Sequence, residues 1–520
     1  MRLSIYLVFI LLPFSAHPLS TPAKVFIYPL PPIYAPSSVF VLEAGGENVP
    51  VVSYNPKYDY AHFSMSEGAV QVSVTLLDGQ EVASANISPQ KLHINGAIKG
   101  RTLSFTLNRD EYLIVKINQL KELIIAADPE EKGKPASKGK NIFNITTYKA
   151  DAAGRTLSTP AFQKAIDEAS AAGKGIVYVP AGVYLLGNLQ LKSNMSLYLE
   201  GGAVLRFTGN AKDYKVNARK ASQKRDLTWW IYTDSGAHNI KIYGRGTLDG
   251  NGKYATDTGH IGNNILALFY TRHFILDGLI IRESGTWALI PTRSKDIIFR
   301  NFKLFNRFDM GENDGIDVME SENVLVQHAI GIALDDPFST KTWEQNTDLC
   351  RNWPGHPLPQ HNIVFEDLLS WTYCYAYKIG QGVMQPQTDI VFKDCVVYDA
   401  AVGIGIHHKW GTSYVKHVVF DNIDIERLSY KNDDNRVWAT FFMQNGDKKG
   451  SGPITDILIR NINIYDLGKS PGKIKGAGGT ALVNGVIFRN VHIPGQIGPA
   501  TTLEQMHMTD TIYCRNIKIL

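Results

Sequence analysis

The chain has 520 residues, of which 44% are hydrophobic and 20% are charged. These values are typical of a folded protein and exclude a largely disordered chain. The length exceeds that of one ordinary compact core, so it indicates two domains or one repetitive domain that grows by stacking. The formal net charge of +4 is mild, and no cluster of Lys or Arg indicates a nucleic-acid partner.

The first twenty residues have the pattern of a secretory signal peptide. Arg2 precedes an apolar run, residues 3–14, which small residues follow. The run is too short to span a bilayer comfortably, and no later stretch has the length and apolarity of a transmembrane helix. We therefore expect residues 1–20 to be removed, and the mature protein to be soluble and either secreted or periplasmic.

Only four cysteines occur, which excludes a disulfide scaffold in a chain of this size. None of their spacings resembles a metal knuckle, so the sequence predicts neither a metal site nor a cofactor.

Residues 21–129 are predicted to form an N-terminal β-sandwich. Short alternating stretches separated by turns occur here without any helical period, and such half-buried strands pair two sheets face to face. The predicted strands are Val25–Tyr28, Ser38–Leu42, Val70–Leu76, Leu103–Leu107 and Tyr112–Ile117. Residues 130–142 are charged, small and poor in apolar side chains, so we place an interdomain linker there.

Residues 143–520 are predicted to form a right-handed parallel β-helix. A helix is expected over Pro160–Ala172, which Ser158 or Thr159 can cap. A pattern of alternating apolar residues closed by a polar pair then recurs every 23 to 29 residues, apart from two insertions. Its central residues are Leu276, Phe299, Val326, Phe365, Phe392, Phe420, Ile459, Phe488 and Cys514. Short strands at this period predict a β-solenoid, whereas the leucine frame and repeated helix of a leucine-rich repeat are missing.

Three carboxylates are expected to meet on neighbouring turns of this solenoid. Asp314 lies 21 residues before Asp335, close to one repeat, and Asp336 follows directly. One repeat corresponds to about 4.8 Å along the stacking direction. Mutual repulsion raises the pKa of at least one such carboxyl, and inverting glycosidases need one protonated and one ionised carboxyl. The competing interpretation is a simple turn at Asp314 and a solvated bend at Asp335 and Asp336.

Several motifs resemble polygalacturonase-like β-helices of glycoside hydrolase family 28. They include Ala161-Phe-Gln-Lys-Ala-Ile-Asp, Val179-Pro-Ala-Gly-Val-Tyr, Gly244-Arg-Gly-Thr-Leu-Asp-Gly-Asn-Gly252 and the Asn-Asp-Gly and Asp-Asp pair at matching separation. The resemblance implies that Asp335 is the general acid, and that Asp314 and Asp336 position and deprotonate the attacking water.

The chain also departs from that family. Pro337 stands where a cysteine usually follows the aspartate pair, and Cys374-Tyr375-Ala376 replaces the Gly-His-Gly motif. The Arg-Ile-Lys motif that holds a galacturonate carboxylate aligns with Gly405-Ile406-His407. An N-terminal β-sandwich ahead of the helix is similar to dextranases and isopullulanases of glycoside hydrolase family 49, which cut neutral α-glucans. The substrate therefore stays open between an acidic and a neutral polysaccharide.

Further groove residues are expected on turns that follow the aspartate pair, where cations and aromatic faces suit sugars. They are Lys341, Trp343, Tyr375, Lys378, His407, His408, Lys409 and Trp410. Adjacent strand residues point to opposite faces, so His407 and His408 are not expected to share a metal. Trp229 and Trp230 fit either core packing or a groove wall.

The sequence thus predicts a secreted, inverting polysaccharide hydrolase without a cofactor, a nucleic-acid partner or a membrane span. A polysaccharide lyase on the same fold would need a basic residue as its catalytic base and often calcium, which the carboxylate cluster could bind, so this alternative stays open. A non-catalytic carbohydrate-binding β-helix would have no need of clustered carboxylates. The oligomeric state stays open.

Overall fold

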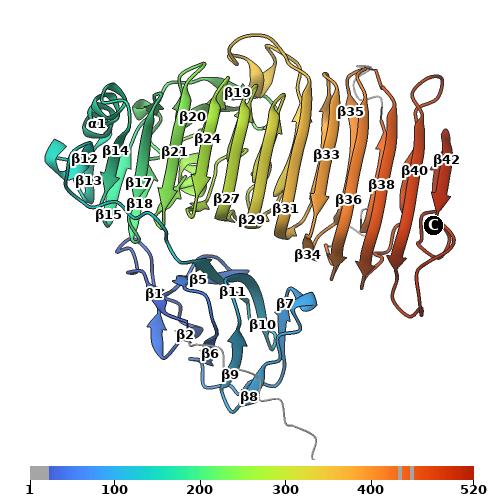
Figure 1. Ribbon diagram of the computed structural model, residues 1–520, viewed down its shortest axis with the longest axis horizontal. Coiled ribbons are helices and arrows are strands. Elements are labelled where there is room, and N and C mark those ends of the chain that lie inside the picture. Colours follow the sequence, from blue (N-terminus) through green and yellow to red (C-terminus); the bar gives the residue numbers. More distant parts are fainter. Residues whose placement is uncertain (1–22, 431–435, 445–449) are drawn as a thin grey trace, which may run out of the picture.

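The computed structural model describes residues 23–430, 436–444 and 450–520. The predicted signal peptide lies outside these residues. Figure 1 confirms the predicted all-β architecture, in which a small sandwich packs beneath one side of a long right-handed parallel β-helix. In the part of the chain that the structure describes, helices with the length and apolarity to cross a membrane are absent.

The N-terminal domain consists of two antiparallel-rich sheets. One contains β1 (Val25–Ile27), β4 (Val51–Val52), β5 (Tyr58–Met65), β7 (Ala85–Ser88), β10 (Glu111–Ile117) and β11 (Glu122–Pro129). The other contains β2 (Phe40–Ala44), β3 (Glu47–Val49), β6 (Val70–Leu76), β8 (Ala97–Lys99) and β9 (Thr102–Leu107), and η1 (Gln90–Leu92) lies in a connection. Alternate side chains of β6 are buried between the sheets, as the period of two requires.

A helix closes the N-terminal end of the β-helix. This helix, α1 (Thr159–Ala171), buries Phe162, Ala165, Ile166 and Ala169 against the first coils. The predicted side-chain cap is wrong, because the Ser158 hydroxyl instead accepts a hydrogen bond from the Asp151 backbone N–H. The remaining short helices are α2 (Gly252–Asp257), η2 (Ile145–Tyr148), η3 (Ala211–Asp213) and η4 (Asp348–Cys350).

Two sides of the β-helix are formed by one continuous 19-stranded sheet. Its strands are β12 (Ile142–Asn144), β13 (Ala153–Leu157), β14 (Gly175–Val179), β15 (Gly182–Leu186), β17 (Met195–Leu199), β18 (Ala203–Phe207), β21 (His238–Gly244), β22 (Thr247–Asp249), β24 (Arg272–Asp277), β25 (Ile280–Arg282), β27 (Lys295–Phe305), β29 (Glu322–Ala333), β31 (Gln360–Thr372), β33 (Gln387–Lys393), β34 (Val396–Asp399), β36 (Val415–Ile425), β38 (Ile454–Ile464), β40 (Val483–His492) and β42 (Cys514–Ile519). The long strand β27 pairs with both β24 and β25, so the sheet bends around a corner.

The predicted repeats form a ladder of buried side chains in this sheet. Leu276 pairs with Phe299, and the register continues through each central residue to Phe488. The final predicted repeat is wrong, because Phe488 pairs with Ile519 and not with Cys514. The Ile512-Tyr-Cys segment imitates the apolar alternation, but Ile512 belongs to β41 (Asp510–Ile512) on another side of the helix.

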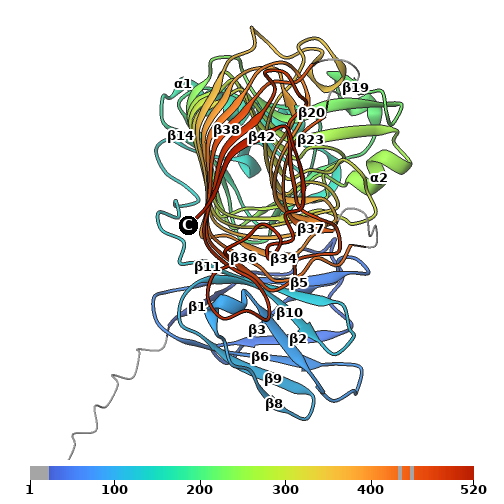
Figure 2. The same ribbon diagram turned by 90° about the vertical axis from the view of Figure 1, so that its right-hand side faces the viewer.

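The third side is a 12-stranded sheet. Besides β41 it contains β16 (Leu189–Leu191), β19 (Ala218–Lys220), β20 (Arg225–Thr233), β23 (Ile261–Phe269), β26 (Leu289–Thr292), β28 (Ile316–Met319), β30 (Phe338–Thr342), β32 (Tyr375–Val383), β35 (Val402–Trp410), β37 (Val437–Met443) and β39 (Lys473–Lys475). Trp230 is fully buried and Trp229 packs 4.3 Å from Phe269, so both tryptophans belong to cores. The view along the helix in Figure 2 shows the sandwich against a different side from β20 and β23.

A buried charge cluster joins the two domains. Asp128, at the end of β11, accepts hydrogen bonds from His62 of the sandwich and from Lys303 of the β-helix. Arg245 of the β-helix lies 3.3 Å from the same carboxylate. Asp128 and Lys303 are fully buried, so the ion pairs replace the hydration that both groups lose.

Candidate active site

The three predicted aspartates lie on neighbouring turns of the β-helix. Asp314 precedes β28, and Asp335 and Asp336 precede β30; these strands pair directly through Ile316 and Phe338. The Gly315 N–H donates to the Asp336 carbonyl at 2.9 Å, which holds the two turns together. A side chain at Gly315 would meet the Pro337 carbonyl oxygen at 2.2 Å, so glycine is required for this close approach.

Asn313 orders both turns, a role that the sequence motif alone did not reveal. Its side-chain oxygen accepts hydrogen bonds from the backbone N–H groups of Leu334 and Asp335, at 3.1 and 3.3 Å. Its amide nitrogen donates to the Arg307 carbonyl. The side chain is fully buried, so these bonds fix the backbone that carries Asp335.

Two buried lysines are bound to the aspartates. The Lys341 ammonium lies 2.8 Å from both Asp314 and Asp317, and the Lys378 ammonium lies 2.6 Å from Asp336. Asp317 is a further carboxylate of the site that the sequence analysis did not single out, although it lies only two residues beyond the Asn-Asp-Gly motif. The pairing means that the two cations stabilise the carboxylates instead of standing free for a substrate.

The environments of adjacent Asp335 and Asp336 shift their pKa values in opposite directions. Burial, and then the Asp336 charge, raise the pKa of Asp335. Burial acts in the same direction on Asp336, but the ammonium groups of Lys378 and Lys341 outweigh it and lower the pKa of Asp336. Asp336 is therefore the ionised member, and Asp335 is the member that can hold a proton.

Asp314 is also favoured in its protonated form. Burial raises the pKa of Asp314 well above its ordinary value, and the Lys341 ammonium offsets only part of that effect. The nearby Asp317 carboxylate adds to the increase. The site thus holds several carboxyls that cannot all be ionised together.

These groups line one pocket of about 380 Å³, here called the aspartate pocket. It gathers the three aspartates with four of the predicted groove residues, Lys341, Trp343, Lys378 and Trp410. Trp343 makes edge contacts with Trp410 at 5.1 Å and with Trp287 at 5.5 Å. Trp287 was not predicted as a site residue, and the Lys341 ammonium lies 4.2 Å from the centre of its ring. Aromatic walls of this kind suit sugar rings.

A second pocket of about 480 Å³ adjoins the first and shares Lys378 and Gln381 with it. We call it the Lys473 pocket. It contains Tyr375 and His407, two more predicted residues, together with Tyr373, Tyr430, Phe442 and Lys473. The His407 ring stacks on Phe442 at 4.2 Å and lies 3.2 Å from the Gln444 side-chain oxygen through Nε2. Burial, and next the Lys378 charge, lower the pKa of His407 to about 3, so this imidazole is neutral.

The remaining two predicted residues do not line either pocket. His408 is fully buried on the opposite face of β35, and its Nε2 lies 2.9 Å from the Ser413 carbonyl oxygen. The Lys409 ammonium lies 4.5 Å from the Trp410 ring centre. Alternation along the strand therefore separates His407 from His408, as predicted, and places only His407 toward the groove.

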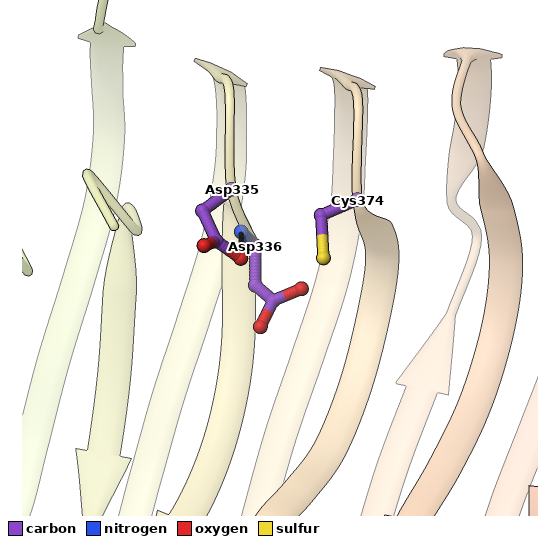
Figure 3. A group of neighbouring side chains, drawn as sticks. All are labelled: Asp335, Asp336 and Cys374. Carbon is purple, nitrogen blue, oxygen red and sulfur yellow. Dashed lines mark hydrogen bonds between the residues drawn. The ribbon is translucent and has the colours of Figure 1, made fainter. Parts of the chain in front are cut away.

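Cys374 lies beside the aspartate pair. Figure 3 shows its side chain on the neighbouring coil beside those of Asp335 and Asp336, and one ligand atom from each of the three residues lies within 4.8 Å of the others. A metal ion bound here would have to displace Lys378 from the Asp336 carboxylate. Burial, and then the two carboxylates, raise the pKa of the Cys374 thiol, so the group stays protonated and apt to donate a hydrogen bond.

Comparisons with known proteins agree with this geometry. Residues 170–359, which include all three aspartates, match the family model described as Glycosyl hydrolases family 28. A probable polygalacturonase from Vitis vinifera is 24% identical over 333 residues, which cover 60% of this chain and 66% of that protein. The match thus spans slightly less than two thirds of that relative. The predicted resemblance to family 28 is confirmed.

Two solved structures share the fold. A family 28 exopolygalacturonase from Yersinia enterocolitica matches with a TM-score of 0.53 and 16% identity, covering 87% of this chain and 96% of that one. Dex49A from Penicillium minioluteum matches with a TM-score of 0.52 and 12% identity, covering 95% of this chain and 96% of that one. At these identities the likeness establishes the β-helix architecture and no more.

Proposed function

We propose that the protein hydrolyses a glycosidic bond of a polysaccharide with inversion, using Asp335 as general acid and Asp336 as the principal base. One observation carries the proposal: adjacent carboxyls in one pocket have their pKa values shifted apart, Asp335 upward and Asp336 downward. A glycosidase needs one carboxyl that donates a proton and another that stays ionised. The inversion itself is what the resemblance to family 28 implies.

Each aspartate has a separate task. Asp335 protonates the leaving oxygen, and Asp336, kept ionised by Lys378, removes a proton from the attacking water. Asp314, fixed by its 2.8 Å contact with Lys341, helps to orient that water. The Trp343 and Trp410 faces hold the sugar rings, so that binding positions the bond beside the acid.

The lysines argue against a polysaccharide lyase. Burial alone would lower their pKa values, but Asp314, Asp317 and Asp336 outweigh it and raise the pKa of Lys341. Asp336, followed by Cys374 and Asp335, outweighs burial in the same way and raises the pKa of Lys378. Cations bound in this way stay protonated near neutral pH, so they are poor candidates for the base that elimination requires.

The charge of the aspartate pocket favours a neutral sugar beside the aspartates. Five carboxyl groups and three ammonium groups line it, and the ammonium groups of Lys220, Lys341 and Lys378 are each held by a carboxylate. A uronate placed here would add a further negative charge without a free cation. We therefore propose a neutral or differently decorated polysaccharide as a better substrate than polygalacturonate, with a neutral α-glucan as the second candidate.

A substrate screen combined with product stereochemistry tests the proposal. The enzyme is incubated with polygalacturonate, dextran, pullulan and sulfated galactans, and reducing ends are measured together with absorbance near the unsaturated-uronate band. Reducing sugar without that absorbance is expected, and proton NMR of the first product should show an inverted anomeric centre. Unsaturated products or retained configuration would contradict it. We further propose that the protein acts outside the cytoplasm, on the basis of its predicted signal peptide.

A further inference from the structure

The two pockets of the groove differ sharply in charge. The aspartate pocket has an excess of carboxyl groups, whereas the described residues that line the Lys473 pocket include no Asp or Glu. Lys378 and Lys473 are its cations, and Lys378 is already bound to Asp336. Among the described residues, no carboxylate lies within ion-pair distance of the Lys473 ammonium, whose recorded contact is with the Phe442 ring at 5.3 Å.

The strand register places Lys473 in the same row of side chains as Lys378, the lysine that binds Asp336. Lys378 pairs with Gly405, Gly405 pairs with Thr440, and Thr440 pairs with Lys473. At about 4.8 Å per strand, the Lys473 Cα lies about 14 Å from that of Lys378 along the groove. Paired positions point to the same face, so both side chains face the groove.

Gly405 opens the space between these two lysines. A Cβ at this position would meet the Tyr375 ring and the Thr440 hydroxyl, both at 2.7 Å. By the family resemblance, Gly405 stands in the place of the arginine of the Arg-Ile-Lys motif and His407 in the place of its lysine, and His407 is neutral here. Neither position therefore supplies a cation, and the next ammonium in the row, that of Lys473, is two strands farther on.

The residue that follows Lys473 in the strand register does not serve as its counter-ion. Asp510 follows Lys473 in the register, but its carboxylate is held by Lys475 at 2.9 Å. Rings flank the open space, since Tyr373 and Tyr430 stack at 4.9 Å and Phe442 lies under His407. A half-buried cation that has no counter-ion among the described residues, beside aromatic faces and the Gln444 amide, is complementary to a sugar that carries an anionic group.

We propose that the Lys473 pocket binds the carboxylate or sulfate ester of a sugar in the same chain as the neutral sugar held at the aspartates. The proposal rests on the proposed function, because it assigns the second pocket to the same polysaccharide. The preferred substrate then carries negative charge on spaced sugars, with an uncharged unit at the cleaved bond. Lys473 is in this view a specificity-determining residue without a part in the bond-breaking step.

Calorimetric binding separates this proposal from the hydrolase assignment. The probes are oligogalacturonides and their methyl-esterified forms, and oligosaccharides of a sulfated galactan and their desulfated forms, each titrated at low and high salt. The inactive Asp335→Asn background keeps the ligand intact. Lys473→Met should weaken binding of one charged probe about tenfold and leave its uncharged form unchanged. The preferred charged probe tells a carboxylate site from a sulfate site.

Two variants sharpen the result. Lys416→Met removes a cation whose partner is Asp456 on another side of the β-helix and should not change binding, whereas Lys473→Arg should keep most of the affinity. Equal affinities of Lys473→Met and its parent for every charged probe, with unchanged melting temperatures, would overturn the site. Charge-selective binding without hydrolysis of any polymer would retain the site and refute the proposed function. Hydrolysis without charge-selective binding would do the reverse.

Discussion

The Lys378 ammonium lies 2.6 Å from a carboxylate oxygen of Asp336, and both groups are buried. This contact separates Asp336 chemically from Asp335, its neighbour in the chain. A buried ion pair of this kind holds one carboxyl ionised while the adjacent carboxyl, deprived of a comparable partner, is biased toward its protonated form.

Loss of the acid is predicted to stop turnover without unfolding the protein. Asp335→Asn should lower kcat by about a hundred- to ten-thousand-fold or more, because the leaving oxygen no longer receives a proton. The melting temperature should hold or rise, since burial and Asp336 raise the pKa of Asp335 and make its charged form unfavourable. Steady-state kinetics and calorimetric melting are the measurements. Wild-type turnover in this variant would refute the acid assignment.

Loss of the Lys378 charge is predicted to change the pH profile. Lys378→Met should let the pKa of Asp336 rise, because the largest effect that opposes burial is removed. The acid limb of kcat/KM should then move to higher pH by about 1 to 3 units. Lys393→Met, which removes a cation paired with Glu366 on another side of the helix, is the matched control. An unshifted acid limb would show that Asp336 is not the base.

Polygalacturonate is predicted to be a poor substrate compared with a neutral or differently decorated polysaccharide. The missing Arg-Ile-Lys cation and the acidic pocket should together cost roughly ten- to a hundredfold in kcat/KM. Measuring kcat/KM for each polysaccharide of the panel at two ionic strengths tests this prediction. Fast, salt-sensitive cleavage of polygalacturonate would contradict the prediction.

The neighbouring histidines are predicted to respond differently to substitution. His407→Gln should raise KM while the melting temperature holds, because His407 faces the Lys473 pocket. His408→Gln should mainly lower the melting temperature, since His408 is buried against the Ser413 carbonyl. The KM and the melting temperature of each variant are compared in parallel. Similar changes in both variants would argue against the alternation that places them on opposite faces.

The interdomain cluster is predicted to make the protein sensitive to acid. Burial, and then Lys303, lower the pKa of His62 from its ordinary 6.5 to about 4. Between these values the unfolded chain binds more protons than the folded one, so stability falls as the pH falls from about 6.5 to about 4. His62 should account for about 1 to 3 kcal/mol of the loss. Denaturant unfolding at pH 7 and about pH 4.5 should show a smaller loss in His62→Gln.

Removing the Asp128 charge at the centre of this cluster should destabilise the protein more than removing His62. Asp128→Asn leaves the buried Lys303 and Arg245 without their carboxylate, at a cost of about 3 to 5 kcal/mol near neutral pH. The free energy of unfolding from denaturant titration measures it. Thr75→Val, in the sandwich sheet that faces away from the β-helix, is the control, because it removes one ordinary side-chain hydrogen bond, that with Thr102. A cost for Asp128→Asn no larger than that of the control would contradict the view that the cluster joins the domains.

The sequence by itself determined the architecture and the approximate place of the site. A repeat of 23 to 29 residues with alternating apolar positions requires stacked parallel strands, because a single coil cannot bury its own apolar face. The same period brings Asp314 beside Asp335 and Asp336. The repeat spacing predicted the wrong strand at the last coil, because Ile512-Tyr-Cys has the same apolar alternation as the strand that ends at Ile519.

Only the tertiary structure decided which ionic partners the carboxylates have. Lys341 and Lys378 were expected near the groove, but their pairing with Asp314, Asp317 and Asp336 depends on side-chain directions that spacing does not specify. The role of Lys473 depends on a register across four strands more than ninety residues apart in sequence. Local patterns set the period of a β-helix, whereas the contacts between its coils set the charge of each pocket.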